Sequence, residues 1–221
     1  MNRIGCVLAV TIALAAIPAL AAKDGGQTSV RLLSADGSSI PAAIVLEKGK
    51  TVKLMAAANT DGAPVPVMWS SSQDATVSVT QDAPGRATLT ALRDWFDEQP
   101  GREPTAIISA CAESTCAQIA VTCVVSLSGT WDAVLDGMWR GVLPHSEDRV
   151  LVFVQRGREI TFDAEPGKTA TLRLDGNTIA VSKKGSILTV FSGIIWSRTA
   201  SEGQFASVYG FTGKWTGKRR P

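Results

Sequence analysis

The sequence predicts an all-β protein in which a β-sandwich is followed by a small antiparallel meander β-barrel. Neither half of the chain shows helical periodicity over a useful length. Both halves contain short segments in which apolar and polar residues alternate, separated by turn residues, as in half-buried strands. Charge and aromatic content change near Ser126: residues 23–126 have a net charge of −3 and residues 127–221 of +4, and ten of the thirteen aromatic residues lie in the second half. This change predicts two domains.

Residues 1–21 are predicted to be a cleavable secretory signal peptide. Arg3 supplies a positive charge, an apolar run follows at 4–20, and Ala19 and Ala21 give the A-x-A pattern that precedes a cleavage site. The apolar run is at the lower limit for a membrane span, and Pro18 interrupts its last turn. Cleavage is expected after Ala21 or Ala22, so we expect a periplasmic or secreted protein with no transmembrane segment after cleavage.

Residues 22–126 are predicted to form the sandwich. The alternating segments lie at 51–56, 65–70, 76–80, 87–92, 105–111 and 116–125. Turn residues separate them, as at Asp61-Gly62 and Pro84-Gly85. About seven short strands over some 100 residues are typical of a β-sandwich.

Four motifs in this half occur in a familiar order. Residues 46–54 read LEKGKTVKL, residues 67–72 read VMWSSS, residues 87–92 read ATLTAL, and the hairpin at 105–125 ends in TCVV. Together they resemble bacterial Ig-like domains of the Big type, over roughly residues 28–125. The resemblance implies an Ig-like sandwich and a role as a spacer or adhesive unit in a bacterial surface protein. The segment 93–104 is longer than the short glycine turn of that family.

Three cysteines follow the predicted signal peptide, so one bridge and one free thiol, or pairing between chains, is expected. Cys111 and Cys116 flank a four-residue turn and should lie opposite each other on paired strands. The strand period of two places Cys116 on the polar outer face and Cys123 on the apolar inner face. We predict a structural Cys111–Cys116 disulfide and a buried free Cys123.

Residues 127–221 are predicted to form the barrel. Strand segments lie at 129–135, 149–155, 159–164, 169–174, 177–182, 186–194 and 204–217, with turns at Gly157, Gly176 and Gly185. Consecutive hairpins without a crossover helix indicate an up-and-down meander. The basic tail that ends in Arg219 and Arg220 is expected to be solvated and disordered, with contact to anionic lipid or polysaccharide as the alternative.

The two ends of this half are alike, because Ser128-Gly129-Thr130-Trp131 is echoed by Thr212-Gly213-Lys214-Trp215. In a closed meander the first and last strands pair, which removes the exposed edges. The G-x-W motif loosely resembles the lipocalin and avidin families, in which this Trp plugs one end of the barrel. The aromatic residues that could line an apolar pocket are Trp131, Phe153, Phe162, Phe191 and Trp215, although a domain this small more often fills its core.

The sequence contains no catalytic or metal motif, so we expect no enzyme, metal or cofactor. Common hydrolase, protease and P-loop patterns are absent, and zinc would require more Cys and His ligands. The single histidine, His145, is expected to be a solvated loop residue in the polar segment 143–148. Neither half is charged enough to suggest nucleic-acid binding.

The extended loop at 93–104 is the candidate binding site. It carries two aromatic residues, Trp95 and Phe96, with three carboxylates at Asp94, Asp97 and Glu98. Such a loop could bind a partner or a cation; the alternative is that the aromatic side chains pack back onto the sandwich while the acids face water.

These observations predict an exported, non-enzymatic envelope protein that acts in binding or adhesion, with a protein or a polysaccharide as its partner. A small-ligand carrier that uses an aromatic-lined barrel pocket is the alternative. An exported hydrolase or hydrolase inhibitor is the third hypothesis.

Overall fold

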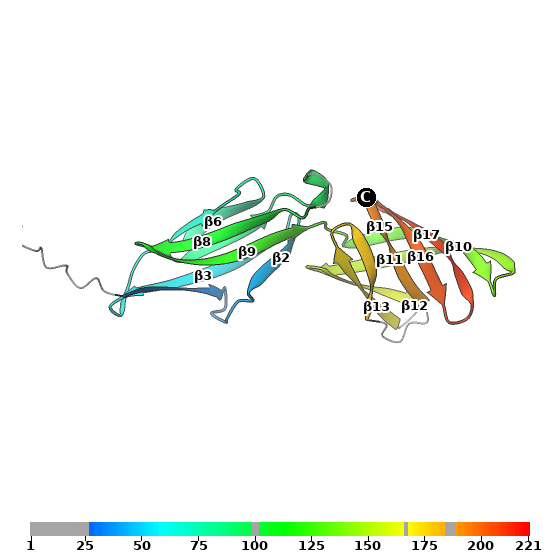
Figure 1. Ribbon diagram of the computed structural model, residues 1–221, viewed down its shortest axis with the longest axis horizontal. Helices are drawn as coiled ribbons and strands as arrows, with labels where there is room; N and C mark the ends of the chain where they lie inside the picture. The colour runs from blue at the N-terminus through cyan, green and yellow to red at the C-terminus, as the bar shows by residue number, and fades with distance from the viewer. Residues whose placement is uncertain (1–26, 99–101, 166–167, 184–188) are drawn as a thin grey trace, which may run out of the picture.

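The computed structural model describes residues 27–98, 102–165, 168–183 and 189–221. These residues form the strands β1 to β17 and one short 3-10 helix, so the fold is all-β. The predicted signal peptide lies outside the described residues. A sandwich and a barrel lie end to end along the longest axis of the molecule (Figure 1).

The sandwich has two sheets. One has the strand order β1-β3-β7-β6, with β4 added to β3: β1 (Thr28–Ser34), β3 (Thr51–Thr60), β4 (Ala63–Pro64), β6 (Val77–Ala83) and β7 (Arg86–Ala91). The other has the order β2-β9-β8-β5: β2 (Ala43–Glu47), β5 (Met68–Ser71), β8 (Thr105–Ala112) and β9 (Thr115–Val124). The sequence does not predict β1, β2 or β4, because β4 has two residues and β1 and β2 alternate only in part.

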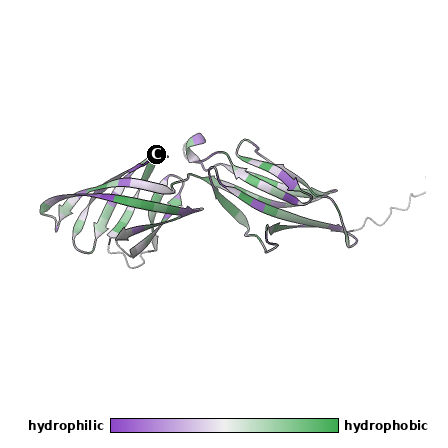
Figure 2. Cartoon of the chain, turned by 180° about the vertical axis from the view of Figure 1, so that it is seen from behind, coloured by the Kyte–Doolittle hydropathy of each residue, from purple (hydrophilic) through white to green (hydrophobic). Residues whose placement is uncertain are grey.

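The core of the sandwich lies between these sheets and consists of alternate residues of the long strands. Leu89, Ile108 and Val121 are fully buried there. Hydrophobic and hydrophilic residues alternate along the strands (Figure 2). This is the pattern expected when one face of each strand is buried and the other faces water.

The predicted disulfide is present between Cys111 and Cys116. The two residues are directly opposite each other in the β8–β9 register, at the end of the hairpin. Cys116 is exposed, whereas Cys123 is fully buried and is the free cysteine of the described chain. Burial, with a smaller contribution from the charge of Asp94, raises the pKa of the Cys123 thiol to about 11. The turn spacing therefore predicted the Cys111–Cys116 pair, and strand periodicity predicted the exposure of Cys116 and the burial of Cys123.

The barrel consists of eight antiparallel strands in sequence order: β10 (Gly129–Trp139), β11 (Leu143–Arg156), β12 (Glu159–Glu165), β13 (Lys168–Asp175), β14 (Thr178–Lys183), β15 (Thr189–Ser197), β16 (Ala200–Ser207) and β17 (Phe211–Arg219). The first and last strands pair along most of their length, from Trp131 opposite Arg219 to Trp139 opposite Phe211. The predicted closure is confirmed.

Three details of the barrel differ from the sequence predictions. Residues 204–217 form two strands, β16 and β17, joined by a turn that contains Gly210 at a φ of 87°. The segment 143–148 is part of β11, so His145 lies in a strand, exposed, with its ring 5.1 Å from that of Phe211. The basic tail is ordered, because Arg219 donates to the carbonyl oxygens of Ser126 and Ser128 and Arg220 pairs with Asp132.

Glycine pairs lie opposite each other in the β15–β16–β17–β10 wall. Gly137 lies opposite Gly213, and Gly193 opposite Gly203. A Cβ atom at Gly213 would lie 2.1 Å from the backbone oxygen of Asp136, so no other residue fits without a shift of the strands. Glycine kinks of this kind allow a small sheet to bend and close.

The interior of the barrel is filled. The rings of Trp131, Phe153, Phe162, Phe191, Phe205 and Phe211 form a continuous series with centroid separations between 4.7 and 6.3 Å. Trp215 closes one side of the series, and its Nε1 donates to the carbonyl oxygen of Ser192 at 2.9 Å. The pocket between Leu151, Phe153, Phe162, Leu172, Phe191 and Trp215 has a volume of about 10 Å³. This is too small for a small-molecule ligand.

Candidate functional site: the junction of sandwich and barrel

The loop that follows β7 carries all five residues predicted as a binding site, and its first turn is a 3-10 helix at Trp95–Asp97. Asp94 caps this helix, since its Oδ1 accepts from the backbone N–H of Phe96 at 2.9 Å. Asp97 accepts in return from the backbone N–H of Asp94 at 2.9 Å. This reciprocal capping box fixes the local conformation and thereby the directions of the neighbouring side chains.

The carboxylate of Asp94 is bound by the barrel. Arg198, in the turn between β15 and β16, donates its Nε and Nη2 to the two oxygens of Asp94, each at 2.7 Å. Asp94 is fully buried, whereas the side chain of Arg198 is 41% exposed. A bidentate contact of this kind is among the strongest polar contacts between side chains, because both charge and geometry match.

Asp97 extends the same cluster. It pairs with Arg198 at 2.7 Å and with Lys48, at the end of the sandwich, at 2.6 Å. Partial burial opposes ionisation of Asp97, but the hydrogen bonds from Lys48 and Arg198 outweigh it and hold the pKa of Asp97 well below its usual range. The hydrogen bonds to Asp94 raise the pKa of Arg198 above its already high value. Asp97 and Arg198 are therefore charged throughout the physiological pH range.

The two aromatic side chains of the loop face the barrel. Phe96 packs against the hydrophobic core of the barrel, and the guanidinium carbon of Arg198 lies 5.9 Å from the centre of its ring. Trp95 lies against the β13–β14 turn, where a Cβ atom at Gly176 would come within 2.6 Å of the indole. Gly176 has a φ of 58°, so the turn conformation and the close approach of Trp95 both require glycine.

A second ionic contact lies at the other end of the loop. Glu103 forms a bidentate pair with Arg158, in the turn between β11 and β12, with Nη1 to Oε1 at 2.8 Å. Oε1 of Glu103 also accepts from the backbone N–H of Gly176 at 3.1 Å. Both ends of the loop are thus attached to the barrel by charge-assisted hydrogen bonds.

The linker between the domains is held by polar side chains as well. Gln155 of β11 accepts from the N–H of Leu127 at 2.6 Å and donates to the carbonyl oxygens of Val125 and Gly157 at 2.9 and 2.7 Å. The carboxylate of Glu47, at the end of β2, accepts from the N–H of Gly157 at 3.3 Å. Burial raises the pKa of Glu47.

Apolar packing continues through the junction. Val124, Val125 and Leu127 are fully buried in the same cluster as the barrel core, and Val45 of the sandwich packs against that cluster. Trp131 lies next to this linker and donates its Nε1 proton to the carbonyl oxygen of Leu127 at 2.9 Å. Trp131 therefore closes the end of the barrel that faces the sandwich.

Four of the five predicted residues contact the barrel: Asp94 and Asp97 through Arg198, Phe96 through the barrel core and Trp95 through Gly176. Glu98 instead pairs with Arg93 of the same loop at 3.0 Å. The sequence did not identify the barrel residues that complete the junction, Arg158, Gly176 and Arg198. All three lie in tight turns. The turns at Gly157 and Gly176 were predicted from the sequence, whereas no turn was predicted at Arg198 and none of the partners was visible.

The junction also borders a cleft of about 520 Å³, lined by Trp95, Arg102, Glu103, Arg158, Asp175 and Asn177, among others. In the described part of the chain, no group of three or more His, Cys, Asp or Glu side chains is arranged to hold a metal ion. Among the same residues, no helix is long and apolar enough to cross a membrane.

Comparisons with known proteins find structural similarity at low scores. No protein-family description and no curated protein matches the chain. Among solved structures, domains 5–6 of the S-layer protein SbsC are similar at a TM-score of 0.33 and 9% identity, over 88% of this chain and 83% of that one. Two longer SbsC structures, domains 1–6 and residues 31–844, both score 0.34 at 13% and 12% identity; each match covers 76% of this chain and 24% of the SbsC chain. Scores at this level establish neither a common fold nor a common function.

Proposed function

We propose that the chain is an exported, non-enzymatic binding or adhesion protein of the bacterial cell envelope. In this proposal the sandwich is an Ig-like module of the Big type, and the barrel is the domain that it presents. The two act as one rigid unit, because the loop at 93–104 serves as a clamp between them. The partner would be a protein, a polysaccharide or a lipid surface of the envelope.

The observation that carries the rigid-unit part of the proposal is the burial of Asp94 against Arg198. A loop that recruits an external partner would leave its charged and aromatic side chains available to solvent. Here Asp94 is fully buried, and its two oxygens are occupied by an arginine of the other domain. Phe96 is likewise engaged by the barrel core. These contacts favour a structural role for the loop, so that binding is assigned to other surfaces of the molecule.

Further features support export and argue for a presenting domain over a carrier. The Cys111–Cys116 disulfide fits an oxidising compartment and the predicted signal peptide. The filled barrel offers no cavity for a carried ligand among the described residues. An eight-stranded barrel with a packed interior is a rigid platform whose outer surface and turns are available for contact.

The test is fractionation of cells that express the full chain, followed by binding of the purified mature protein to isolated cell envelopes. We expect a periplasmic or secreted product that lacks residues 1–21 or 1–22 and that sediments with envelopes. Asp74→Ala, which changes an exposed sandwich residue, is the matched control and should sediment equally. Two results would contradict the proposal. One is a protein that stays in the cytoplasm with its N-terminal segment uncleaved, and the other is a mature protein that does not sediment with envelopes.

A further inference from the structure

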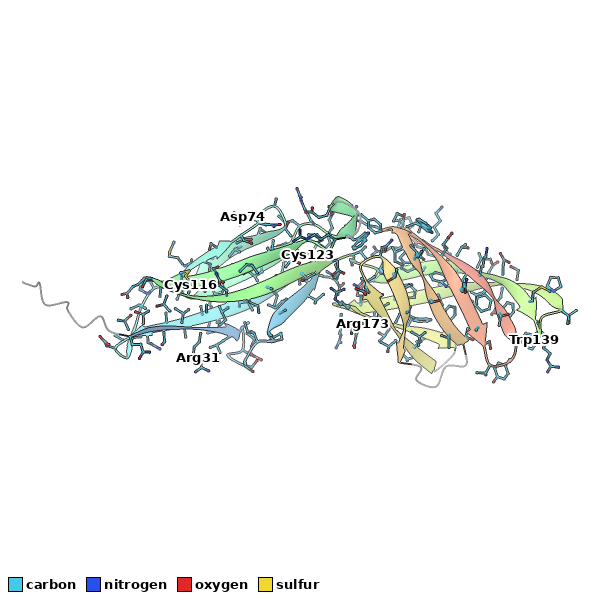
Figure 3. All side chains as sticks on the ribbon, in the orientation of Figure 1. Arg31, Asp74, Cys116, Cys123, Trp139 and Arg173 are labelled. Atoms are coloured by element: carbon cyan, nitrogen blue, oxygen red, sulfur yellow. A yellow bond between two sulfur atoms is a disulfide. The ribbon has the colours of Figure 1, made fainter. Side chains whose placement is uncertain are left out.

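Two neighbouring turns lie at the end of the barrel opposite the sandwich; we call them the barrel tip and define it as residues 138–143 and 207–210. The tip follows β10 and β16 to the far end of the molecule, where Figure 3 labels Trp139. Its backbones are joined, since the N–H of Arg140 donates to the carbonyl oxygen of Gly210 at 2.7 Å. The tip is therefore one surface and not two separate loops.

Large apolar side chains gather on the tip. Val142, Val208 and Leu143 are 71%, 70% and 61% exposed, and Tyr209 is 57% exposed. Trp139 and Met138 are each more than a third exposed. Large apolar side chains that gather on one exposed surface are typical of a site that contacts a partner or a membrane.

The tip is also well anchored. The ring of Trp139 lies 6.3 Å from that of Phe211, which packs on Phe205 at 4.7 Å inside the barrel. Turn hydrogen bonds join Val142 to Trp139 at 3.2 Å and Gly210 to Ser207 at 3.0 Å. The exposed side chains are thus presented on a fixed frame, which limits the entropy lost on binding.

Charge and shape indicate which kind of partner fits. Arg140 is the one basic side chain of the tip, and the tip has no carboxylate. Trp and Tyr beside aliphatic residues and a single arginine are the side chains that favour the interface between lipid headgroups and acyl chains. The tip protrudes at the end of the barrel, whereas a protein partner would have to supply a matching apolar hollow. The open groove on the barrel wall brings Glu202, Gln204 and Lys214 together with Ile179, Ile194 and Trp215, so it is a mixed surface and not a wholly apolar hollow for the tip of a second copy.

We propose that the barrel tip docks onto the surface of an anionic lipid bilayer. Val142, Leu143, Val208 and Tyr209 enter the interface, Trp139 lies at headgroup level and Arg140 faces the lipid phosphates. This deepens the proposed function by naming its partner, and it rests on that function only for the location of the protein at the envelope.

The test uses flotation of the mature protein with vesicles of phosphatidylethanolamine and phosphatidylglycerol, compared with vesicles of phosphatidylcholine. The variant Val142→Ser/Leu143→Ser should weaken binding to the anionic vesicles by about a hundredfold. Each aliphatic side chain that becomes buried in the bilayer contributes about tenfold to the affinity. Arg140→Gln should lower the preference for anionic vesicles by about fivefold. The matched control is Val150→Ser/Val152→Ser, two valines that are 55% and 54% exposed on the barrel wall away from the tip, and it should bind as the wild type does.

The outcomes separate the alternatives. Thermal melting of the tip variant should be unchanged, since both substituted side chains are mostly exposed. Equal loss of binding in the wall variant, or no binding of the wild type to either vesicle, would overturn the proposal. Concentration-dependent dimerisation that the tip substitutions abolish would assign the tip to a second copy instead. Asp94→Ala weakens the contact between the domains and should leave the affinity for vesicles unchanged. Loss of the junction and loss of lipid binding by the tip are therefore distinguishable.

Discussion

Replacement of Asp94 by alanine is the sharpest perturbation of the junction. The change removes the cap of the 3-10 helix, worth about 1 kcal/mol. It also removes two charge-assisted hydrogen bonds to Arg198, worth about 1.5–3 kcal/mol between buried groups. Because the Arg198 side chain is 41% exposed and regains water, we reduce the second contribution to about 1–2 kcal/mol. The expected loss in the free energy of unfolding is therefore about 2–3 kcal/mol.

A double-mutant cycle isolates the part that crosses the junction. Asp94→Asn, Arg198→Gln and the double variant are compared by urea unfolding, with the fluorescence of the tryptophans as the signal. We expect a coupling energy of about 1–2 kcal/mol between the two residues, which lie on different domains. Arg198→Gln alone should be strongly destabilising, because it leaves a buried carboxylate without its counter-ion. A coupling energy below about 0.3 kcal/mol, within the range of independent sites, would refute the reasoning.

Three further predictions concern single positions. Gly176→Ala should lower the free energy of unfolding by about 1–3 kcal/mol, because its Cβ would meet the Trp95 indole and its φ is positive. The control is Gly141→Ala, which is also at positive φ but has open space around it. Equal losses of stability in a melting experiment would show that the contact with Trp95 does not matter. The raised pKa of Glu47 means that the folded state binds its proton more tightly than the unfolded state. Stability from this group should therefore decline as pH rises from 4.5 through the raised value, and Glu47→Gln should flatten that part of a pH series of urea titrations. Cys123 should not react with a thiol reagent at pH 8 until the protein unfolds, because its thiol is buried and its pKa is about 11; fast labelling of the native protein would contradict this.

Strand periodicity and turn residues were sufficient to predict the fold class. The β8–β9 hairpin shows why: the four-residue turn fixed the register, and the register fixed the disulfide and the burial of Cys123. Closure of the barrel was likewise visible in the repeated Gly-x-Trp motif at its two ends. The division of 204–217 into two strands was missed, because Val208 and Tyr209 are apolar turn residues that continue the alternating pattern. Both side chains are exposed at the barrel tip and do not belong to the core.

The candidate site shows the limit of the sequence more clearly. The cluster at Asp94–Asp97 was recognised as unusual, but its partner Arg198 is about a hundred residues away and lies in a turn with no motif of its own. Contacts between domains depend on which end of the barrel faces the sandwich, and alternation along strands does not encode that choice. Glycine at position 176 was read as a turn residue only, whereas the structure adds the close approach of Trp95 as a second reason for it.

We propose that the sandwich and the barrel form one rigid unit. Residual dipolar couplings of backbone amides, measured for the mature protein in a weakly aligning medium, test it most directly. A rigid unit gives the same alignment tensor for β1–β9 as for β10–β17, with the relative orientation seen in Figure 1. Two tensors of different magnitude would show independent domain motion and contradict the claim.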